Sequence, residues 1–444
     1  MKYLQADWPF PAARMPFFYG WVIALVSTLG FLFSIPGQTM GMAVFADTFI
    51  TEFGLSRTQL STAYLIGTVL SALILPRAGR WYDRYGARTS LVGAAIVLGV
   101  TLVFISGIDL LALGLVGLTG LPLVWFSFPL ILFGYFGVRF SGQGVLTSAS
   151  RNVLLIWFNR RRGLVSGIRG VFVSLGFSIA PLIIAAMIIE FGWRGALWVM
   201  AGAVGLGFAF LALLTVRDRP EVSGLTVDDG YSPAAKHQPY QAHAAERTLG
   251  EARRDPVFWL YASALSMHAL FGTAVTFHVV AIFGQAGRDQ VEAFAYFLPQ
   301  AIVSVCVNLA ASALSDYSRL KPVLVVMLMF FLLGALGLVR LDSQWGYWLL
   351  VVGFGAGGGL WGVLSNLVFI RHYGSLHLGE ISGLNTAITV FASAIGPVSF
   401  SLANDSFGSF QAAAIVCAIG LAALLLISVF TPQPNDRLPR GLGI

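Results

Sequence analysis

The chain has 444 residues, of which 57% are hydrophobic and only 11% charged, and its mean hydropathy is +0.80. A water-soluble domain carries about a quarter charged residues, so this composition excludes the soluble enzyme classes. The net charge of +7 comes from basic residues in short clusters between apolar runs, as in membrane topology signals, and implies no nucleic-acid partner. The two cysteines, Cys306 and Cys417, lie in separate apolar runs and suggest neither a disulfide framework nor a metal site.

Apolar runs recur along the whole chain, and each is long enough to cross a bilayer as a helix at about 1.5 Å per residue. We predict twelve spans, at residues 18–43, 58–77, 88–107, 126–150, 162–189, 194–216, 257–284, 291–315, 321–340, 345–370, 379–404 and 409–431. The longest polar interval divides six spans from six. The predicted fold class is therefore an all-α polytopic membrane protein with two six-helix bundles, at 1–216 and 256–444, joined by a cytoplasmic linker at 217–255.

The orientation of the spans follows from the distribution of Lys and Arg, because cytoplasmic loops retain positive charge. One side of the predicted topology collects 21 of these residues and the other side only 4, with two more inside spans. We expect both termini to be cytoplasmic in a multi-pass protein of the inner or plasma membrane.

The two halves repeat a set of short motifs at a constant offset of 216 residues (382 minus 166). The motifs are Ser166-Gly167-Ile168, Ala180-Pro181 and Phe191-Gly192, which recur as Ser382-Gly383-Leu384, Gly396-Pro397 and Phe407-Gly408. The fifth and eleventh spans are thus predicted to be pseudo-equivalent, as in secondary transporters built from two helical bundles around a midplane site. A weaker echo at Asp316 and Lys321 has an offset of 233, so we expect about 17 extra residues (233 minus 216) within 108–125.

The segment between the second and third spans has the form G-x-x-x-D-R-x-G-x-R, with Gly79, Asp83, Arg84, Gly86 and Arg88. It resembles the loop motif of the major facilitator superfamily. Its glycines allow two helix ends to approach, and its aspartate can face the positive N-terminal end of a neighbouring helix. The resemblance implies that this helix is the eleventh span, and that the aspartate holds the two bundles together when the cavity opens outward. The alternative is a topology determinant made of loop arginines.

The resemblance extends over the whole chain, and its other motifs are most similar to the bacterial monocarboxylate-transporter and oxalate:formate-antiporter-like branch. These motifs are Phe18-Tyr19-Gly20-Trp21, Arg139-Phe140-Ser141-Gly142-Gln143-Gly144 and Trp157-Phe158. Organic-acid carriers of that branch commonly have an arginine eight residues before the aspartate that ends the eighth span, where this chain has Asn308, and oxalate carriers use a lysine that its eleventh span lacks. The resemblance therefore implies neither lactate nor oxalate as the substrate.

Two arginines lie inside the predicted spans, whereas all twenty acidic residues fall in loops or at span ends. Charges at this depth are costly unless they face a wet cavity or a partner, so they indicate function. Arg139 in the fourth span has a guanidinium fork that matches a carboxylate, and the alternative is a structural role with bonds to backbone carbonyls or to Gln143. Arg169 can extend to the membrane surface, or it can face Asn385, its counterpart at the 216 offset, across the inner vestibule.

The seventh and eighth spans supply the other candidate residues. His268 and His278 can take up a coupled proton near physiological pH, although each can instead be a packing residue. Gln300, Ser304 and Asn308 recur every four residues and share one helix face, which either borders the cavity or packs against another helix.

We therefore predict a secondary transporter that moves a small organic anion, a mono- or dicarboxylate, by alternating access with proton coupling. The expected partners are this substrate and the lipid bilayer, for a monomer without cofactor or metal. One alternative is an exporter of a larger apolar or drug-like compound. Two others, a membrane-embedded enzyme and a non-transporting sensor, are disfavoured by the lack of a catalytic constellation within the spans and of an output domain.

Overall fold

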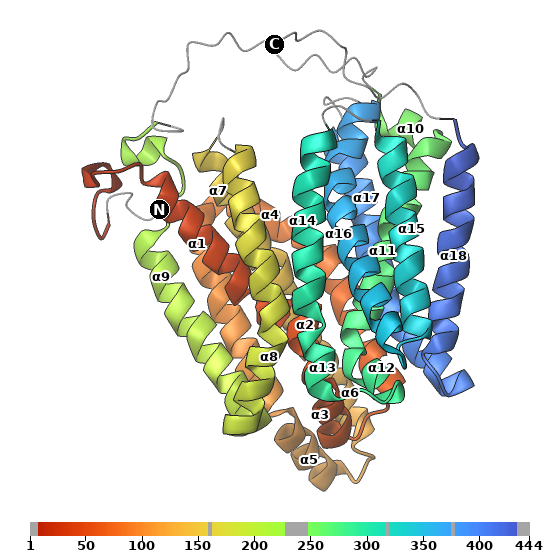
Figure 1. The fold of residues 1–444 in the computed structure, drawn as a ribbon. Coiled ribbons are helices and arrows are strands. Elements are labelled where there is room, and N and C mark those ends of the chain that lie inside the picture. The colour runs from red at the N-terminus through yellow and green to blue at the C-terminus, as the bar shows by residue number, and fades with distance from the viewer. Residues whose placement is uncertain (1–7, 159–161, 227–246, 316–318, 374–377, 433–444) are drawn as a thin grey trace. The chain divides into compact units, whose positions relative to one another are not determined.

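A computed structural model describes residues 8–158, 162–226, 247–315, 319–373 and 378–432, and every regular element within these ranges is a helix. The chain divides into two compact units, Met1–Lys236 and His237–Ile444. The division falls inside the predicted linker, whose residues 227–246 lie outside the described ranges. Figure 1 shows the helices of both units, and each unit is described by itself.

The first unit contains nine α-helices, two π-helical stretches and three short 3-10 turns among the described residues. They are η1 (Ala12–Arg14), α1 (Gly20–Phe33), η2 (Ile35–Gly37), α2 (Thr39–Ala43), α3 (Ala46–Phe53), α4 (Arg57–Ser106), α5 (Ile108–Thr119), α6 (Val124–Val138), the π-helix η3 (Arg139–Leu146), α7 (Thr147–Trp157), α8 (Arg162–Gly202), the π-helix η4 (Ala203–Phe208), α9 (Ala209–Thr215) and η5 (Glu221–Ser223).

The second unit is simpler, because most of its spans are single helices. They are α10 (Leu249–Ala252), α11 (Pro256–Phe277), α12 (Val279–Gln285), α13 (Gln290–Ala295), α14 (Phe297–Ser315), α15 (Leu320–Val339), α16 (Gln344–Tyr373), α17 (Leu378–Phe407) and α18 (Gln411–Phe430).

The predicted twelve-span architecture is confirmed. Ten helices of the described residues are long and apolar enough to cross a membrane. One of them, Val165–Thr215, holds the fifth and sixth predicted spans, and the shorter apolar helix Gly20–Phe33 belongs to the first. Glycines in the left-handed region, Gly86 at φ 88° and Gly192 at φ 70°, separate consecutive spans within α4 and α8.

The same helix pairs pack together in both units, as the sequence repeat predicts. In the first unit α4 packs against α6 and η3, against η4 and α9, and α1 packs against α8. In the second unit α14 packs against α16, α15 against α18, and α11 against α17. Under the repeat, each pair in the first unit corresponds to one pair in the second, so the pseudo-symmetry extends from sequence to packing.

Three predicted elements differ from the structure. The segment 79–88, expected to be a loop, is helical except at Gly86. The first span breaks at Pro36, which lacks an amide donor, and the seventh breaks between α11 and α12 at His278.

The extra segment expected in the first half, within 108–125, forms α5. This helix is apolar but has only 12 residues, so it is too short to cross a membrane.

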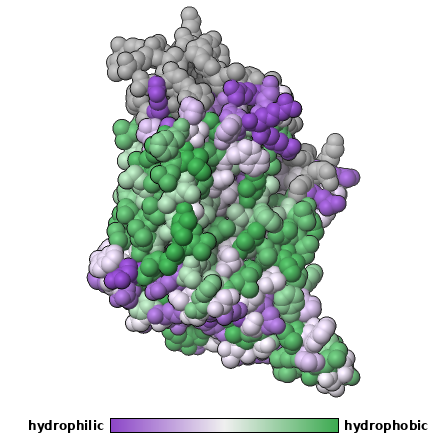
Figure 2. Space-filling model, turned by 90° about the vertical axis from the view of Figure 1, so that its right-hand side faces the viewer, coloured by the Kyte–Doolittle hydropathy of each residue, from purple (hydrophilic) through white to green (hydrophobic). Residues whose placement is uncertain are grey.

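The outer surface has the apolar character that a bilayer requires. Figure 2 shows hydrophobic side chains gathered over the middle of one face, with hydrophilic side chains toward both ends. In α18 the exposed side chains include Val416, Ile419 and Phe430. Exposed apolar side chains on helices of membrane-spanning length match a lipid environment, so the chain is a multi-pass integral membrane protein.

Candidate functional site

The break in the first span lies directly on the π-helix η3. At Gly37 an added Cβ would lie 2.7 Å from the Cα of Gly142 and 2.8 Å from the backbone nitrogen of Gln143. Only glycine allows this approach, because any larger residue would meet backbone atoms that cannot move aside. The break is therefore a fixed contact between two polypeptide backbones in the interior of the first unit.

Arg139 stands beside this contact and is only 1% exposed. Its Nη1 donates a hydrogen bond to the carbonyl oxygen of Gly37 at 3.2 Å, and its guanidinium lies 5.1 Å from the ring centroid of Tyr64. The Tyr64 hydroxyl is in turn 2.7 Å from the hydroxyl of Thr39. Arg139 thus donates to a backbone carbonyl, as the structural alternative expected, and among the described residues it forms no hydrogen bond with Gln143.

The contacts of Arg139 leave part of its hydrogen-bonding capacity unused. Its Nε is buried and has no hydrogen-bond partner among the described residues, and no described carboxylate is in ion-pair distance. The hydroxyl of Tyr135, whose ring is 5.5 Å from that of Tyr64, is likewise buried without a partner there. Buried polar atoms are normally satisfied, so these two atoms indicate a position where a polar ligand or water binds.

Sequence reasoning missed Tyr64, Tyr135 and Thr39, which form the surroundings of Arg139. The available signal was the presence of two tyrosines within apolar spans, since a buried tyrosine hydroxyl requires a polar partner.

Arg169 and Asn385 are equivalent under the repeat, and each also has a buried polar atom without a hydrogen-bond partner among the described residues. The Arg169 guanidinium lies 4.7 Å from the ring centroid of Phe31, and its Nη1 is buried without a partner among the described residues. Asn385 is buried, and its Oδ1 is also without a described partner. The two residues belong to different units, so their predicted meeting across a vestibule stays a prediction.

The two histidines have different surroundings in the second unit. His268 stacks on Phe331, with ring centroids 4.5 Å apart and planes at 17°, and lies 5.2 Å from Trp361. Its Nδ1 is buried and has no partner among the described residues. His278 is almost fully buried, and its Nε2 lies 2.8 Å from the carbonyl oxygen of Pro397. A carbonyl can only accept, so Nε2 of His278 holds the proton and joins α11 to α17.

The predicted polar stripe of α14 faces α16. The amide of Asn308 donates to the carbonyl of Gly359 at 2.9 Å, and a Cβ at Gly358 would lie 3.5 Å from the Ser304 hydroxyl oxygen. A Cβ at Gly355 would lie 2.7 Å from the carbonyl oxygen of Gln300. The glycines of α16 allow close helix packing, which is the second of the two roles expected for the stripe. All three polar side chains remain partly exposed.

The motif between the second and third spans is attached to the end of the sixth. The backbone amide of Arg88 donates to Oδ1 of Asp218 at 2.9 Å, and its Nε donates to the carbonyl of Val216 at 2.6 Å. At Gly86 an added Cβ would lie 2.5 Å from the Asp218 carboxylate, whereas at Gly79 it would meet no atom within 4 Å. A close approach is therefore observed at Gly86, whereas the role expected for Gly79 stays a prediction.

The roles of Arg84 and Asp83 in the motif are less constrained by the structure. Arg84 is exposed and lies 5.3 Å from the ring centroid of Tyr85. The side chain of Asp83 lies outside the described part of the chain, as does most of the start of α17, so the predicted contact between them stays a prediction. Sequence reasoning missed Asp218, which is the first acidic residue after the sixth span.

Comparison with protein families gives one match over most of the chain. The model of the Major Facilitator Superfamily matches residues 26–397. The predicted resemblance to this family, on the basis of the motif at 79–88, is confirmed.

Two curated relatives are small-anion carriers by their names. The chain is 27% identical over 189 residues to the probable sulfoacetate transporter SauU of Cupriavidus necator, a match that covers 41% of this chain and 38% of that protein. It is 24% identical over 229 residues to the oxalate:formate antiporter of Oxalobacter formigenes, covering 51% of this chain and 47% of that one. The chain thus matches less than half the length of these relatives.

A solved structure shares the fold over almost the whole chain. It is a bacterial homologue of the human lysosomal transporter Spinster in an inward-facing, occupied conformation. The TM-score is 0.67 at 16% identity, and the match covers 95% of this chain and 99% of that one. At this identity the likeness concerns the fold alone.

Proposed function

The chain belongs to the major facilitator superfamily, and from this premise we propose that it carries a small organic anion across the inner or plasma membrane by alternating access. The family and the named relatives make it a transporter rather than an enzyme. The proposed substrate is a mono- or dicarboxylate, and both termini are proposed to be cytoplasmic on the basis of the 21 to 4 charge bias.

One observation is the main support for an anionic substrate. Two guanidiniums, those of Arg139 and Arg169, lie within membrane-spanning helices, and each has a buried nitrogen without a described hydrogen-bond partner. Among the described acids none forms an ion pair with either. A carboxylate would supply both the missing acceptors and the missing negative charge, and each charge-assisted hydrogen bond is worth about 1.5–3 kcal/mol.

The names of the relatives agree with this inference. Sulfoacetate, oxalate and formate are all small anions, and each named protein is similar to this chain over part of its length. The chain lacks the arginine at Asn308 and the eleventh-span lysine of the oxalate carriers, so its substrate is proposed by class and not by identity.

His268 is the proposed carrier of the coupled proton. Its buried Nδ1 has no hydrogen-bond partner among the described residues and can accept a proton, and the same is true of Nδ1 of His278. The two differ because Nε2 of His278 donates to the Pro397 carbonyl and so joins α11 to α17, whereas the ring of His268 is held only by aromatic stacking among the described residues. A monocarboxylate that moves together with one proton adds no net charge to the membrane interior, and a dicarboxylate adds one charge instead of two, which lowers the cost of crossing it. We therefore assign coupling to His268 and a packing role to His278.

The segment 79–88 is the proposed gate. Arg88 attaches the start of the third span to the end of the sixth through Val216 and Asp218, so these spans move as one body. Asp83 is proposed to contact the start of the eleventh span in one state of the cycle. An Asp83→Asn variant should then transport more slowly with unchanged ligand affinity, and equal transport rates would contradict the gate.

The second candidate function is export of a larger apolar compound. The hydrogen bond from Arg139 to the Gly37 carbonyl supports it, because an arginine with a structural role need not bind substrate. Under this alternative the aromatic surroundings of His268 would line the binding site.

Counterflow in proteoliposomes distinguishes the two functions. Vesicles that contain the purified full chain are loaded with one member of a panel of mono- and dicarboxylates, and exchange is compared with that of the matched amides. We expect exchange of at least one acid and none of its amide. Equal exchange of acids and amides, or exchange only of uncharged apolar compounds, would overturn the proposal in favour of the exporter.

A further inference from the structure

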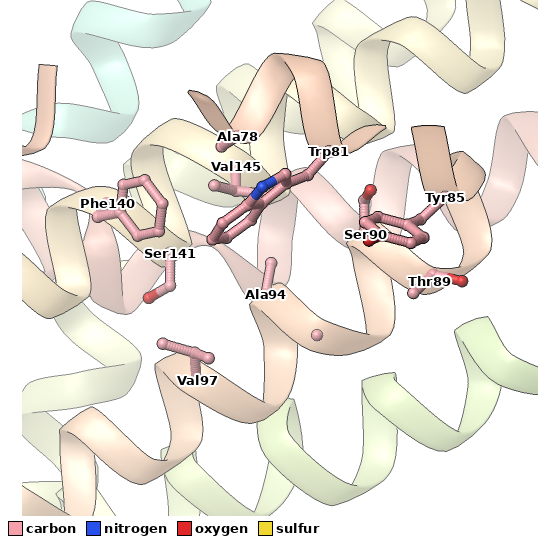
Figure 3. A pocket seen from close by; sticks show the side chains of 11 residues that line it. Ala78, Trp81, Tyr85, Thr89, Ser90, Ala94, Val97, Phe140, Ser141 and Val145 are labelled. Carbon is pink, nitrogen blue, oxygen red and sulfur yellow. The ribbon is translucent and has the colours of Figure 1, made fainter. Parts of the chain in front are cut away.

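A cavity in the first unit is lined by none of the residues assigned above to the substrate. Its volume is about 480 Å³, within the usual range of ligand pockets. It is lined by both halves of α4, on either side of the Gly86 break, and by η3. In Figure 3 the indole of Trp81 lies between Phe140 on one side and Ser90 and Tyr85 on the other.

The walls of this cavity offer apolar contacts. The Ser90 hydroxyl already donates to the carbonyl of Gly86 at 2.8 Å, and the Ser141 hydroxyl donates to that of Gly137 at 2.6 Å. The remaining lining includes Ala94, Val97 and Val145. At Gly93 an added Cβ would meet no atom within 4 Å, so the floor of the cavity is open space. An occupant therefore has to be apolar where it enters the cavity.

The cavity opens toward the lipid-facing surface. Trp81 is 60% exposed and Tyr85 is 42% exposed, and the same stretch of α4 continues with the exposed apolar side chains Ile96 and Val100. Trp and Tyr are typical of the boundary between the acyl chains and the headgroups. These features place the opening at the membrane interface, on the predicted cytoplasmic side.

Two exposed arginines lie next to the opening. Arg77 precedes Trp81 by four residues and Arg84 follows it by three, so all three share one face of the helix. No described acid forms an ion pair with either arginine. An apolar groove with exposed positive charge at its membrane-interface end matches a molecule that has an acyl chain and an anionic headgroup.

We propose that this cavity binds an anionic glycerophospholipid of the cytoplasmic leaflet. One acyl chain lies against Trp81, Gly93 and Phe140, and the headgroup phosphate lies between Arg77 and Arg84. The bound lipid contacts both halves of α4 and the π-helix that contains Arg139, so it connects the membrane to the gate segment without entering the proposed substrate site.

Photo-crosslinking of the purified full chain tests this site. The probe is phosphatidylglycerol with a diazirine at mid-chain, and labelled peptides are located by mass spectrometry. In the wild type we expect label on residues 78–97 and 140–145. Gly93→Leu fills the open floor and should reduce this label at least fivefold. Gly202→Leu is the matched control, because its Cβ also meets no atom within 4 Å but lies outside the cavity, and it should label as the wild type does.

The headgroup is tested with the same probe in competition with unlabelled lipids. Phosphatidylglycerol should displace the label several times better than phosphatidylethanolamine, and the double variant Arg77→Gln/Arg84→Gln should lose this preference. Arg254→Gln, at an exposed arginine of the second unit, should keep it. Three results would overturn the proposal: label outside the cavity, undiminished label in Gly93→Leu, or equal competition by an alkane or a zwitterionic lipid in the wild type.

Discussion

The interiors of the two units differ in the kind of polar group that they contain. In the first unit the polar groups are the fixed cations Arg139 and Arg169, which lie against Tyr64 and Phe31. In the second unit the buried titratable group is the imidazole of His268, which is stacked on Phe331. The repeat has thus preserved the packing of the spans while their chemistry diverged. We infer that one unit recognises the charge of the substrate and the other handles the proton.

The largest effect is expected at His268, because it decides whether transport depends on a proton gradient. His268→Gln should abolish uptake driven by an imposed pH gradient and leave counterflow exchange measurable. His278→Gln is the matched comparison, since the new amide can still donate to the Pro397 carbonyl, and it should keep gradient-driven uptake. Gradient-driven uptake that persists in His268→Gln would remove the proposed division of roles.

The next largest effect, on ligand binding, is expected at Arg169 and Asn385, which are equivalent under the repeat. Arg169→Gln should weaken binding of the acid roughly tenfold, which corresponds to about 1.4 kcal/mol, and change binding of its amide much less. Asn385→Ala should change acid and amide equally, because it removes a neutral group. Titration calorimetry with both ligands checks this. A larger loss of acid preference in Asn385→Ala would place charge recognition in the second unit.

The smallest effects should be on stability. Tyr64→Phe keeps the ring beside Arg139 but removes the hydroxyl contact with Thr39, so it should cost about 1 kcal/mol. Tyr64→Leu also removes the ring face and should cost about 1–2 kcal/mol more, because a desolvated cation loses its partner. Phe331→Leu, which removes the ring stacked on His268, is the control for ring loss. Thermal unfolding in detergent measures the stability lost in each of the three variants. Equal losses in Tyr64→Leu and Phe331→Leu would show that the contact between the Arg139 cation and the ring contributes nothing to stability.

The fold was predictable from the sequence because its determinants are long and local. Apolar runs fix the spans, and the motifs around Pro181 and Pro397 reveal which spans are equivalent. The breaks were not predictable in the same way. The approach of Gly37 to Gly142 depends on residues about a hundred positions apart, and no local pattern marks the π-helix that receives it.

The candidate site was only partly predictable for a related reason. A charge inside an apolar run identifies Arg139, but its partner is the backbone carbonyl of Gly37, and a carbonyl has no signature in the sequence. The same holds for His278, which contacts the carbonyl of Pro397. Asp218 was missed because a single acid after a span resembles any loop residue until Gly86 and Arg88 are seen to contact it.

Arg139 decides most directly whether the first unit recognises an anion. The measurement is titration calorimetry of a transported acid and its amide against the wild type, Arg139→Lys and Arg139→Gln. Removing one partner of a desolvated charge pair costs about 2–5 kcal/mol, so Arg139→Gln should lose nearly all acid binding. Arg139→Lys should lose much of it, because an ammonium group cannot form two parallel hydrogen bonds. In both variants the acid should lose its advantage over the amide. A folded Arg139→Gln protein that still binds the acid with the wild-type preference would contradict the anion site.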